Sequence, residues 1–189
     1  MRTDDEKIQD SERLATLQRT ALLDTPPEEA FDRLTRLATT LLRVPVALVS
    51  LVDGDRQFFK SSVGLPEPLA SLRQTPLTHS FCKFAVASRE PLIVSDARLD
   101  PNFVQHPAVS ELGLVAYAGI PLISSQGHAL GAFCVVDGQP HDWTEEDIEV
   151  LRVVEVTLHT GRSASQRARA TRCGVVPLPC HYGWEPGGQ

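Results

Sequence analysis

The first residues of the chain pass from a polar segment into a helical pattern of apolar side chains. Residues 1–10 are mostly polar and acidic, and we expect them to be disordered. Residues 11–23 then place Leu14, Leu17 and Ala21 on one helical face. This spacing predicts an amphipathic helix.

A second helix is predicted over residues 25–42. Thr25 is expected to be its N-cap, Pro26 lies at the first helical position, and Glu28 would close a capping box. The apolar positions that recur at helical spacing are expected to face the core. These positions are Phe31, Leu34, Leu37, Ala38 and Leu41.

The pattern changes to β-strands after residue 44. An almost wholly apolar, β-branched run over 45–52 predicts a central strand that is covered on both faces. Asp53-Gly54-Asp55 is typical of a hairpin turn, and residues 57–63 form the returning strand. A proline-containing loop of 64–78 follows, and a loop of that length is usually functional or mobile.

Three further strands are predicted over residues 92–94, 115–123 and 129–136. Residues 95–112 separate the first two as a loop with a short helix, and Thr144 caps a last amphipathic helix. Residues 166–189 are rich in proline and glycine, and we expect them to be irregular or disordered.

The order of these elements predicts one α+β domain over residues 11–165. The strands come in hairpins, so the sheet should be antiparallel, with helices packed against it. The chain has 189 residues, enough to bury a core of ordinary size. Its net charge of −6 argues against nucleic acid as a partner.

Membrane insertion and secretion are not predicted. No apolar run approaches the ~20 residues that span a bilayer, and the acidic start does not resemble a signal peptide. The four cysteines are therefore expected to be reduced thiols in a cytoplasm. Cys173, Cys180 and His181 have the wrong spacing for a zinc site and lack a fourth ligand, so no metal is predicted.

Cys82 is the strongest candidate for a reactive side chain in this sequence. It lies in a short apolar segment after Thr78 and Ser80, both good helix caps. A cysteine in the first helical turn is stabilised as a thiolate, and His79 and Lys83 would act in the same direction. The alternative is a buried, inert thiol that packs as a small hydrophobe.

Five blocks of the sequence resemble the GAF domain, in the form that often precedes histidine kinase or diguanylate cyclase domains in bacteria. The blocks occur in the family's order, and the resemblance covers about residues 12–165, which is most of the chain. They are LLDTPPEEAFD (22–32), ALVSLVD (47–53), SFC (80–82), YAGIPL (117–122) and LGAFCVVD (130–137).

The resemblance implies a central antiparallel sheet of five or six strands. The N- and C-terminal helices would pack on one face, and a ligand pocket would lie on the other, under residues 64–78 and 95–112. The pocket walls would include aromatic side chains and a few polar or reactive groups. The candidates are Phe59, Phe81, Phe103 and Tyr117 for the walls, and Cys82, Asp96 and Cys134 for the polar groups. For each aromatic, ordinary core packing is the favoured alternative.

Other activities of the family have weaker support. Cyclic-nucleotide binding is associated with an Asn-Lys-Phe-Asp-Glu signature, whereas this chain has one asparagine, Asn102, and no lysine after Lys83. Bilin attachment usually uses a cysteine followed by histidine, and Cys82 is followed by lysine. His79 and His106 lie in expected pocket covers and could serve haem or another ligand, although a surface or capping role is favoured. No cofactor is named by the sequence.

The expected function is a sensory or regulatory module that is not an enzyme. It would bind an unidentified small molecule or read redox state, and would signal through its terminal helices to a partner protein. A homodimer is predicted through the stripes of Leu14 and Leu17 and of Ile148, Leu151 and Leu158. The alternative function is a thiol-dependent reductase of the free methionine sulfoxide type, with Cys82 or Cys134 as nucleophile.

Overall fold

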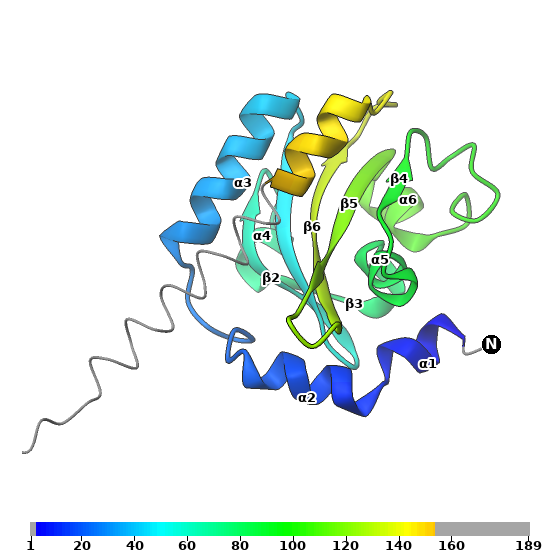
Figure 1. Ribbon diagram of the computed structural model, residues 1–189. Coiled ribbons are helices and arrows are strands. Elements are labelled where there is room, and N and C mark those ends of the chain that lie inside the picture. The colour runs from blue at the N-terminus through cyan, green and yellow to red at the C-terminus, as the bar shows by residue number, and fades with distance from the viewer. Residues whose placement is uncertain (1–2, 154–189) are drawn as a thin grey trace, which may run out of the picture.

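A computed structural model describes residues 3–153 of the protein (Figure 1). Six antiparallel strands form one sheet in the order β3-β2-β1-β6-β5-β4. Their bounds are β1 Val46–Val52, β2 Arg56–Val63, β3 Gln74–Pro76, β4 Leu92–Val94, β5 Ala116–Ile123 and β6 Ala129–Asp137. The helices are α1 Asp4–Ile8, α2 Ser11–Arg19, α3 Glu29–Leu42, α4 Leu69–Leu72, the 3-10 turn η1 Leu77–His79, α5 Cys82–Ser88 and α6 Pro107–Leu112. A last helix covers 145–153 within the described range.

The predicted α+β architecture with a helical face and an opposite face is confirmed. Residues of α3 and the last helix pack with the odd-numbered positions of β1, such as Val49, in one apolar cluster. Leu48 and Val52 on the other face of β1 pack with α5 and α6 in a second cluster. The helices of the two clusters lie on opposite sides of the sheet (Figure 1). The sheet therefore separates a helical face from the face where a pocket was expected.

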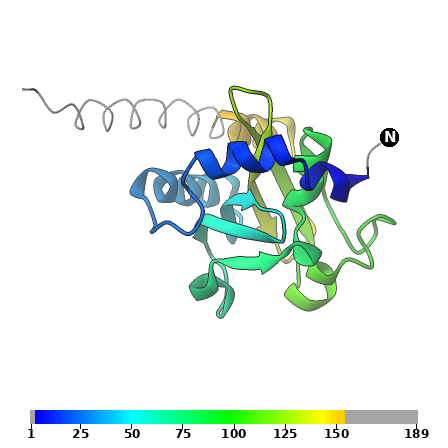
Figure 2. The same cartoon turned by 90° about the horizontal axis from the view of Figure 1, so that it is seen from below.

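The prediction that residues 1–10 are disordered is wrong for the described part. Thr3 caps α1 through a complete capping box with Glu6, and Ile8 is buried against the α5 side of the domain. Figure 2 shows α1 and α2 in sequence along one end of the sheet. Arg13 of α2 is buried, and its guanidinium donates to the backbone oxygens of Ile8, Val52 and Ala129. This arginine fastens the N-terminal segment to the sheet.

The predicted start of α3 is also wrong. The helix begins at Glu29, with Glu28 as its N-cap and no side-chain cap. The Thr25 hydroxyl instead accepts from Lys60 Nζ at 2.7 Å. Lys60 is fully buried and also binds the backbone oxygen of Pro26 and the Glu28 carboxylate. A buried ammonium needs such partners. Thr25 and Glu28, the two side chains of the predicted capping box, therefore bind Lys60 instead.

The sheet-facing side of α3 differs from the prediction at two positions. The buried stripe is Phe31, Thr35, Ala38 and Leu42, with Thr35 bonded to the Ser61 hydroxyl. Leu37 and Leu41, which were expected to face the core, are 47% and 54% exposed. Helical spacing alone fits both sets of positions, and the polar Thr35 gives no apolar signal for its buried position.

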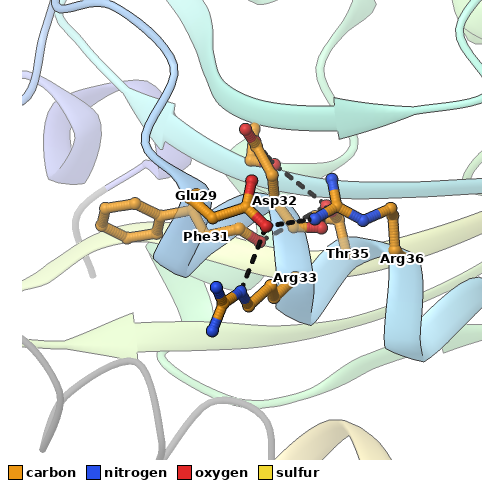
Figure 3. A network of polar contacts seen from close by, with 7 residues as sticks. Glu29, Phe31, Asp32, Arg33, Thr35 and Arg36 are labelled. Carbon is orange, nitrogen blue, oxygen red and sulfur yellow. Dashed lines mark hydrogen bonds and ion pairs between the residues drawn. The ribbon is translucent and has the colours of Figure 1, made fainter.

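The outer surface of α3 carries an ionic cluster. Figure 3 shows Glu29 between Arg33 and Arg36, with Oε1–nitrogen distances of 3.1 and 2.7 Å. The hydrogen bond from Arg33 lowers the pKa of the Glu29 carboxyl, which nevertheless lies in solvent. Exposed pairs of this kind contribute little to stability.

Candidate functional site

A cavity of about 430 Å³ opens on the face of the sheet that carries α5 and α6. Strands β1, β2, β5 and β6 supply its floor, α5 supplies one side, and residues 65–69 with the C-terminal half of α6 surround its mouth. Most of its walls are apolar side chains. They are Val46, Leu48, Phe59, Leu65, Leu69, Phe81, Ala108, Leu112, Leu114 and Val136.

Two cysteines meet at the floor of this cavity. The Sγ atoms of Cys82 and Cys134 lie 3.5 Å apart, and both side chains are buried. The Tyr117 hydroxyl donates to Cys82 Sγ at 3.3 Å. Strand alternation brings these groups together, because Tyr117 and Cys134 project from β5 and β6 on the face that α5 covers. Both cysteines and Tyr117 also line the cavity.

The two thiols are not equivalent. The hydrogen bond with Cys134 lowers the pKa of Cys82 and outweighs the opposing effect of burial, and Tyr117 adds to the lowering. The same bond, together with burial, raises the pKa of Cys134 well above its usual value. Burial raises the pKa of Tyr117, which therefore keeps the proton that it donates. Cys82 is the more acidic thiol of the pair.

The start of α5 positions Cys82. As predicted, this residue opens the helix, and the Ser80 hydroxyl accepts from the Lys83 backbone nitrogen at 3.1 Å. The same hydroxyl donates to Oε1 of Gln57 on β2. Ser80 thus connects the helix start to the sheet floor.

The polar groups of the cavity lie toward its β3 side and its mouth. Gln57 and Thr75 are paired across β2 and β3, and the buried Thr75 hydroxyl has no hydrogen-bond partner among the described residues. At the mouth, His79 Nε2 lies 3.1 Å from Glu111 Oε2. Glu67 also lines the mouth, and no lysine or arginine is found among the described lining residues.

Five of the seven predicted site residues line this cavity, namely Phe59, Phe81, Cys82, Tyr117 and Cys134. Phe103 lies behind Phe81, with ring centroids 4.8 Å apart, so it supports the wall without forming it. The expectation that Asp96 contributes to the pocket is wrong, because its carboxylate binds Arg98 outside the lining at 2.6 Å.

A family model described as "GAF domain" matches residues 26–154. The chain belongs to the GAF domain family. It is 36% identical over 159 residues to "Cyclic di-GMP phosphodiesterase PA2567" of Pseudomonas aeruginosa, a match that covers 81% of this chain. The chain spans only 26% of that relative's length. Family and relative together support a regulatory, sensory role for this domain.

Solved structures share the fold. The GAF domain of an Acinetobacter phosphoenolpyruvate-protein phosphotransferase has a TM-score of 0.58 at 18% identity, covering 86% of this chain and 99% of that one. A free methionine-R-sulfoxide reductase from Neisseria meningitidis, solved with its substrate, has a TM-score of 0.59 at 18% identity, covering 89% of this chain and 95% of that one. At these identities the likeness concerns the fold alone.

Residues 3–153 of this GAF domain contain no group of three or more His, Cys, Asp or Glu side chains that could hold a metal ion. The same part of the chain has no helix long and apolar enough to cross a membrane. The tail residues Cys173, Cys180 and His181 lie outside the described residues.

His106 caps a helix of this GAF domain and does not line the cavity. Its Nδ1 accepts from the Ala108 backbone nitrogen at 3.2 Å, and its ring packs on Phe81 with centroids 4.6 Å apart. Burial, with smaller contributions from Lys83 and His79, lowers the pKa of His106 to about 4. Protonation of Nδ1 would also remove the cap, so a neutral ring belongs to the folded state.

Folding stability should therefore fall as the pH drops. The pKa of about 4 in the folded domain is below the unfolded value of about 6.5, so the unfolded chain takes up the proton first. The free energy of unfolding begins to fall near pH 6.5, and the loss is complete near pH 4. Because solvent screens the charge, the total loss is about 1 to 2 kcal/mol. His106→Asn keeps a capping oxygen without titrating. Urea unfolding at pH 7 and 4.5 should give a smaller pH effect in this variant, and an unchanged effect would contradict the assignment to His106.

Proposed function

We propose that this GAF domain is a sensor that binds a small ligand in the cavity above Cys82 and signals the occupied state through its helical face. The observation that carries the proposal is the cavity itself, about 430 Å³ with mainly apolar walls. This size lies within the range of small-molecule sites. Ligand contact with α5 and β6 would change the sheet that α3 and the last helix cover on its other side.

The lining suggests the chemistry of the ligand. Its two carboxylates, Glu67 and Glu111, lie at the mouth, and His79 is already paired with Glu111. The Gln57 oxygen is occupied by Ser80, which leaves its amide N–H groups as donors beside the Thr75 hydroxyl. We infer a neutral or cationic ligand that has an aromatic or aliphatic body and a carbonyl oxygen for Gln57 and Thr75.

Phosphate-bearing ligands fit this lining poorly. A phosphate group is normally bound by arginine, lysine or a series of backbone N–H groups. The described lining residues include no such cation and two carboxylates. A role of this domain in regulating a cyclic di-GMP phosphodiesterase, as the name of the relative suggests, is therefore proposed without cyclic di-GMP as the cavity ligand.

Three matched probes test the proposal. We expect 4-(aminomethyl)benzamide to bind the reduced protein most tightly, benzamide less tightly and 4-carbamoylbenzoate least, because only the first combines the amide with a cation for the mouth. Millimolar dissociation constants suit compounds of this size. Val46→Phe should abolish binding by filling the cavity, while the free energy of unfolding stays within about 1 kcal/mol.

Calorimetric titration and urea unfolding measure both quantities. Val153→Phe, on the exposed part of the last helix, is the matched control and should bind as the wild type does. Tightest binding by the anionic probe would contradict the proposed ligand class. Equal binding by Val46→Phe and wild type would contradict the cavity as the site.

The 3.5 Å separation of Cys82 and Cys134 also favours a second candidate, a thiol-dependent reductase of free methionine sulfoxide. That chemistry needs a thiolate nucleophile and a second thiol within reach. Turnover of free methionine sulfoxide with a dithiol reductant tests it. Absence of turnover by the reduced wild type would end this candidate and leave the sensor proposal.

A homodimer and a signalling partner stay predictions. Leu17 and Leu151, from the two stripes expected to pair across the dimer, are buried within their own domain. Among the described residues of α3 and the last helix, the large exposed apolar side chains are instead Leu37, Leu41 and Val153. These two helices lie on the same side of the sheet in Figure 1. We propose this surface for a dimer or partner. Leu158 lies outside the described residues.

A further inference from the structure

The pair of thiols takes no part in the polar contacts proposed for the ligand. The polar contacts proposed for the ligand involve Gln57 and Thr75, whereas Cys82 and Cys134 lie at the floor with their sulfur atoms 3.5 Å apart. Both side chains are closed off from bulk solvent, yet both line the cavity. A reagent can therefore reach them only by the route that the ligand would use.

We propose that Cys82 and Cys134 form a dithiol which an organic hydroperoxide entering the cavity oxidises to an intramolecular disulfide. The inference rests on the proposed function only in using the same cavity, and it does not require the ligand described above. The apolar walls favour a hydroperoxide with an alkyl or aryl group, because such a group buries apolar surface on entry.

The first step is attack of the Cys82 thiolate on the terminal oxygen of the hydroperoxide. An S–O bond forms, the O–O bond breaks, and the departing alkoxide takes up a proton to become an alcohol. Cys82 is thereby oxidised by two electrons to the sulfenic acid, and the hydroperoxide is reduced by two electrons. In the second step Cys134 sulfur attacks Cys82 sulfur, so that an S–S bond forms and an S–O bond breaks. The departing hydroxide takes the Cys134 proton and leaves as water.

The contacts assign the roles of the two thiols. The Tyr117 hydroxyl donates to Cys82 sulfur, and the Cys134 thiol lies within hydrogen-bond distance of it, where it can donate its proton. Both donors favour its thiolate, which is the nucleophilic form. Cys134 loses its proton less readily, because its pKa is raised by the bond with Cys82 and by burial. Cys82 is therefore the attacking thiol and Cys134 the resolving one.

Oxidation would also change the cavity. A disulfide has an S–S distance of about 2.05 Å, so the two sulfur atoms must approach by about 1.5 Å from their present 3.5 Å. Cys82 is the first residue of α5, whereas Cys134 is held in the middle of β6 between β1 and β5. The helix start has the greater freedom, so we expect α5 to move toward the sheet and narrow the cavity floor.

Peptide mapping of the full wild-type chain tests the proposal directly. Reduced protein is treated with cumene hydroperoxide, quenched by alkylation and digested without reductant. The expected product is a peptide pair linked through Cys82 and Cys134, and dithiothreitol should reverse it. Linkage only among Cys173, Cys180 and other thiols, or no linkage at all, would overturn the proposal. This arm needs no variant and does not depend on any substituted protein folding.

Two variants then test the order of the steps. In Cys134→Ser the sulfenic acid has no resolving thiol, so dimedone should label Cys82. In Cys82→Ser, Cys134 should be labelled at least 10-fold more slowly. Equal or faster labelling of Cys134 would reverse the assignment of roles. The probe titrations described above use reduced protein without hydroperoxide, so failure of ligand binding and failure of disulfide formation are distinguishable.

Discussion

Replacing Arg13 with methionine is expected to lower the free energy of unfolding by about 3 kcal/mol. The guanidinium donates to the backbone oxygens of Ile8 at 2.5 Å and Val52 at 2.8 Å, with a longer contact to Ala129 at 3.5 Å. Methionine fills similar space but leaves these buried acceptors without a donor, and each such group costs about 1 to 3 kcal/mol. Relief from burying the arginine charge offsets part of the loss.

The control for Arg13 lies on the same helix. Arg19 is exposed and bonds to the side chains of Thr16 and Gln126, so Arg19→Met should change stability by less than about 1 kcal/mol. Urea unfolding measures both variants. Amide hydrogen exchange should also be faster over α1 in Arg13→Met, because the backbone oxygen of Ile8 loses its hydrogen bonds from Arg13 of α2. A stability loss equal to that of Arg19→Met would show that Arg13 does not fasten the segment.

Gly119→Ala is expected to disturb the thiol site as well as the sheet. A Cβ at this position would overlap the Tyr117 hydroxyl oxygen and lie 2.6 Å from its Cζ. The tyrosine ring passes over the glycine on the face where it reaches Cys82. We expect a loss of about 3 kcal/mol from the forced displacement of a fully buried ring. We also expect a higher pKa for Cys82, because the displaced hydroxyl no longer donates to it.

Urea unfolding and the pH dependence of Cys82 alkylation measure these two effects. Gly138→Ala is the control, because its Cβ would meet only the Gly113 oxygen, at 3.7 Å. Tyr117→Phe should raise the Cys82 pKa without the steric loss, so the two effects can be separated. If Gly119→Ala matched Gly138→Ala in both measurements, the ring would not occupy the place that the structure gives it.

Much of the fold was predictable because its strands carry strong local signals. The β-branched run at 46–52 and the Asp53-Gly54-Asp55 turn identify the central hairpin from composition alone. The predictions fail where contacts with residues distant in the sequence determine the local structure. Lys60 removes Thr25 from a helix cap, and no local pattern indicates that contact. The Thr3–Glu6 capping box of α1 is a local signal that the prediction of disorder did not use, whereas the burial of Ile8 beside α5 depends on the tertiary structure.

Some residues of the candidate site were likewise predictable from the sequence, and others were not. Cys82 was predictable from the helix start that follows Ser80, and Tyr117 and Cys134 from the family resemblance. Gln57 and Thr75 were missed, because their importance depends on the β2–β3 pairing inside a segment expected to be a loop. Alternation from the predicted wall residue Phe59 could have indicated Gln57, two positions away on the same strand. Asp96 is a polar candidate in the sequence, but its carboxylate pairs with its neighbour Arg98.

We propose that the face of the sheet that carries α5 and the two thiols binds a small, non-anionic ligand. Chemical-shift mapping with 4-(aminomethyl)benzamide on the reduced, isotopically labelled chain tests it most directly. We expect saturable shifts at the backbone amides of Gln57, Thr75 and Cys82, and none for Val46→Phe. Shifts confined to α3 and the opposite face of the sheet, or none at saturating probe, would contradict it.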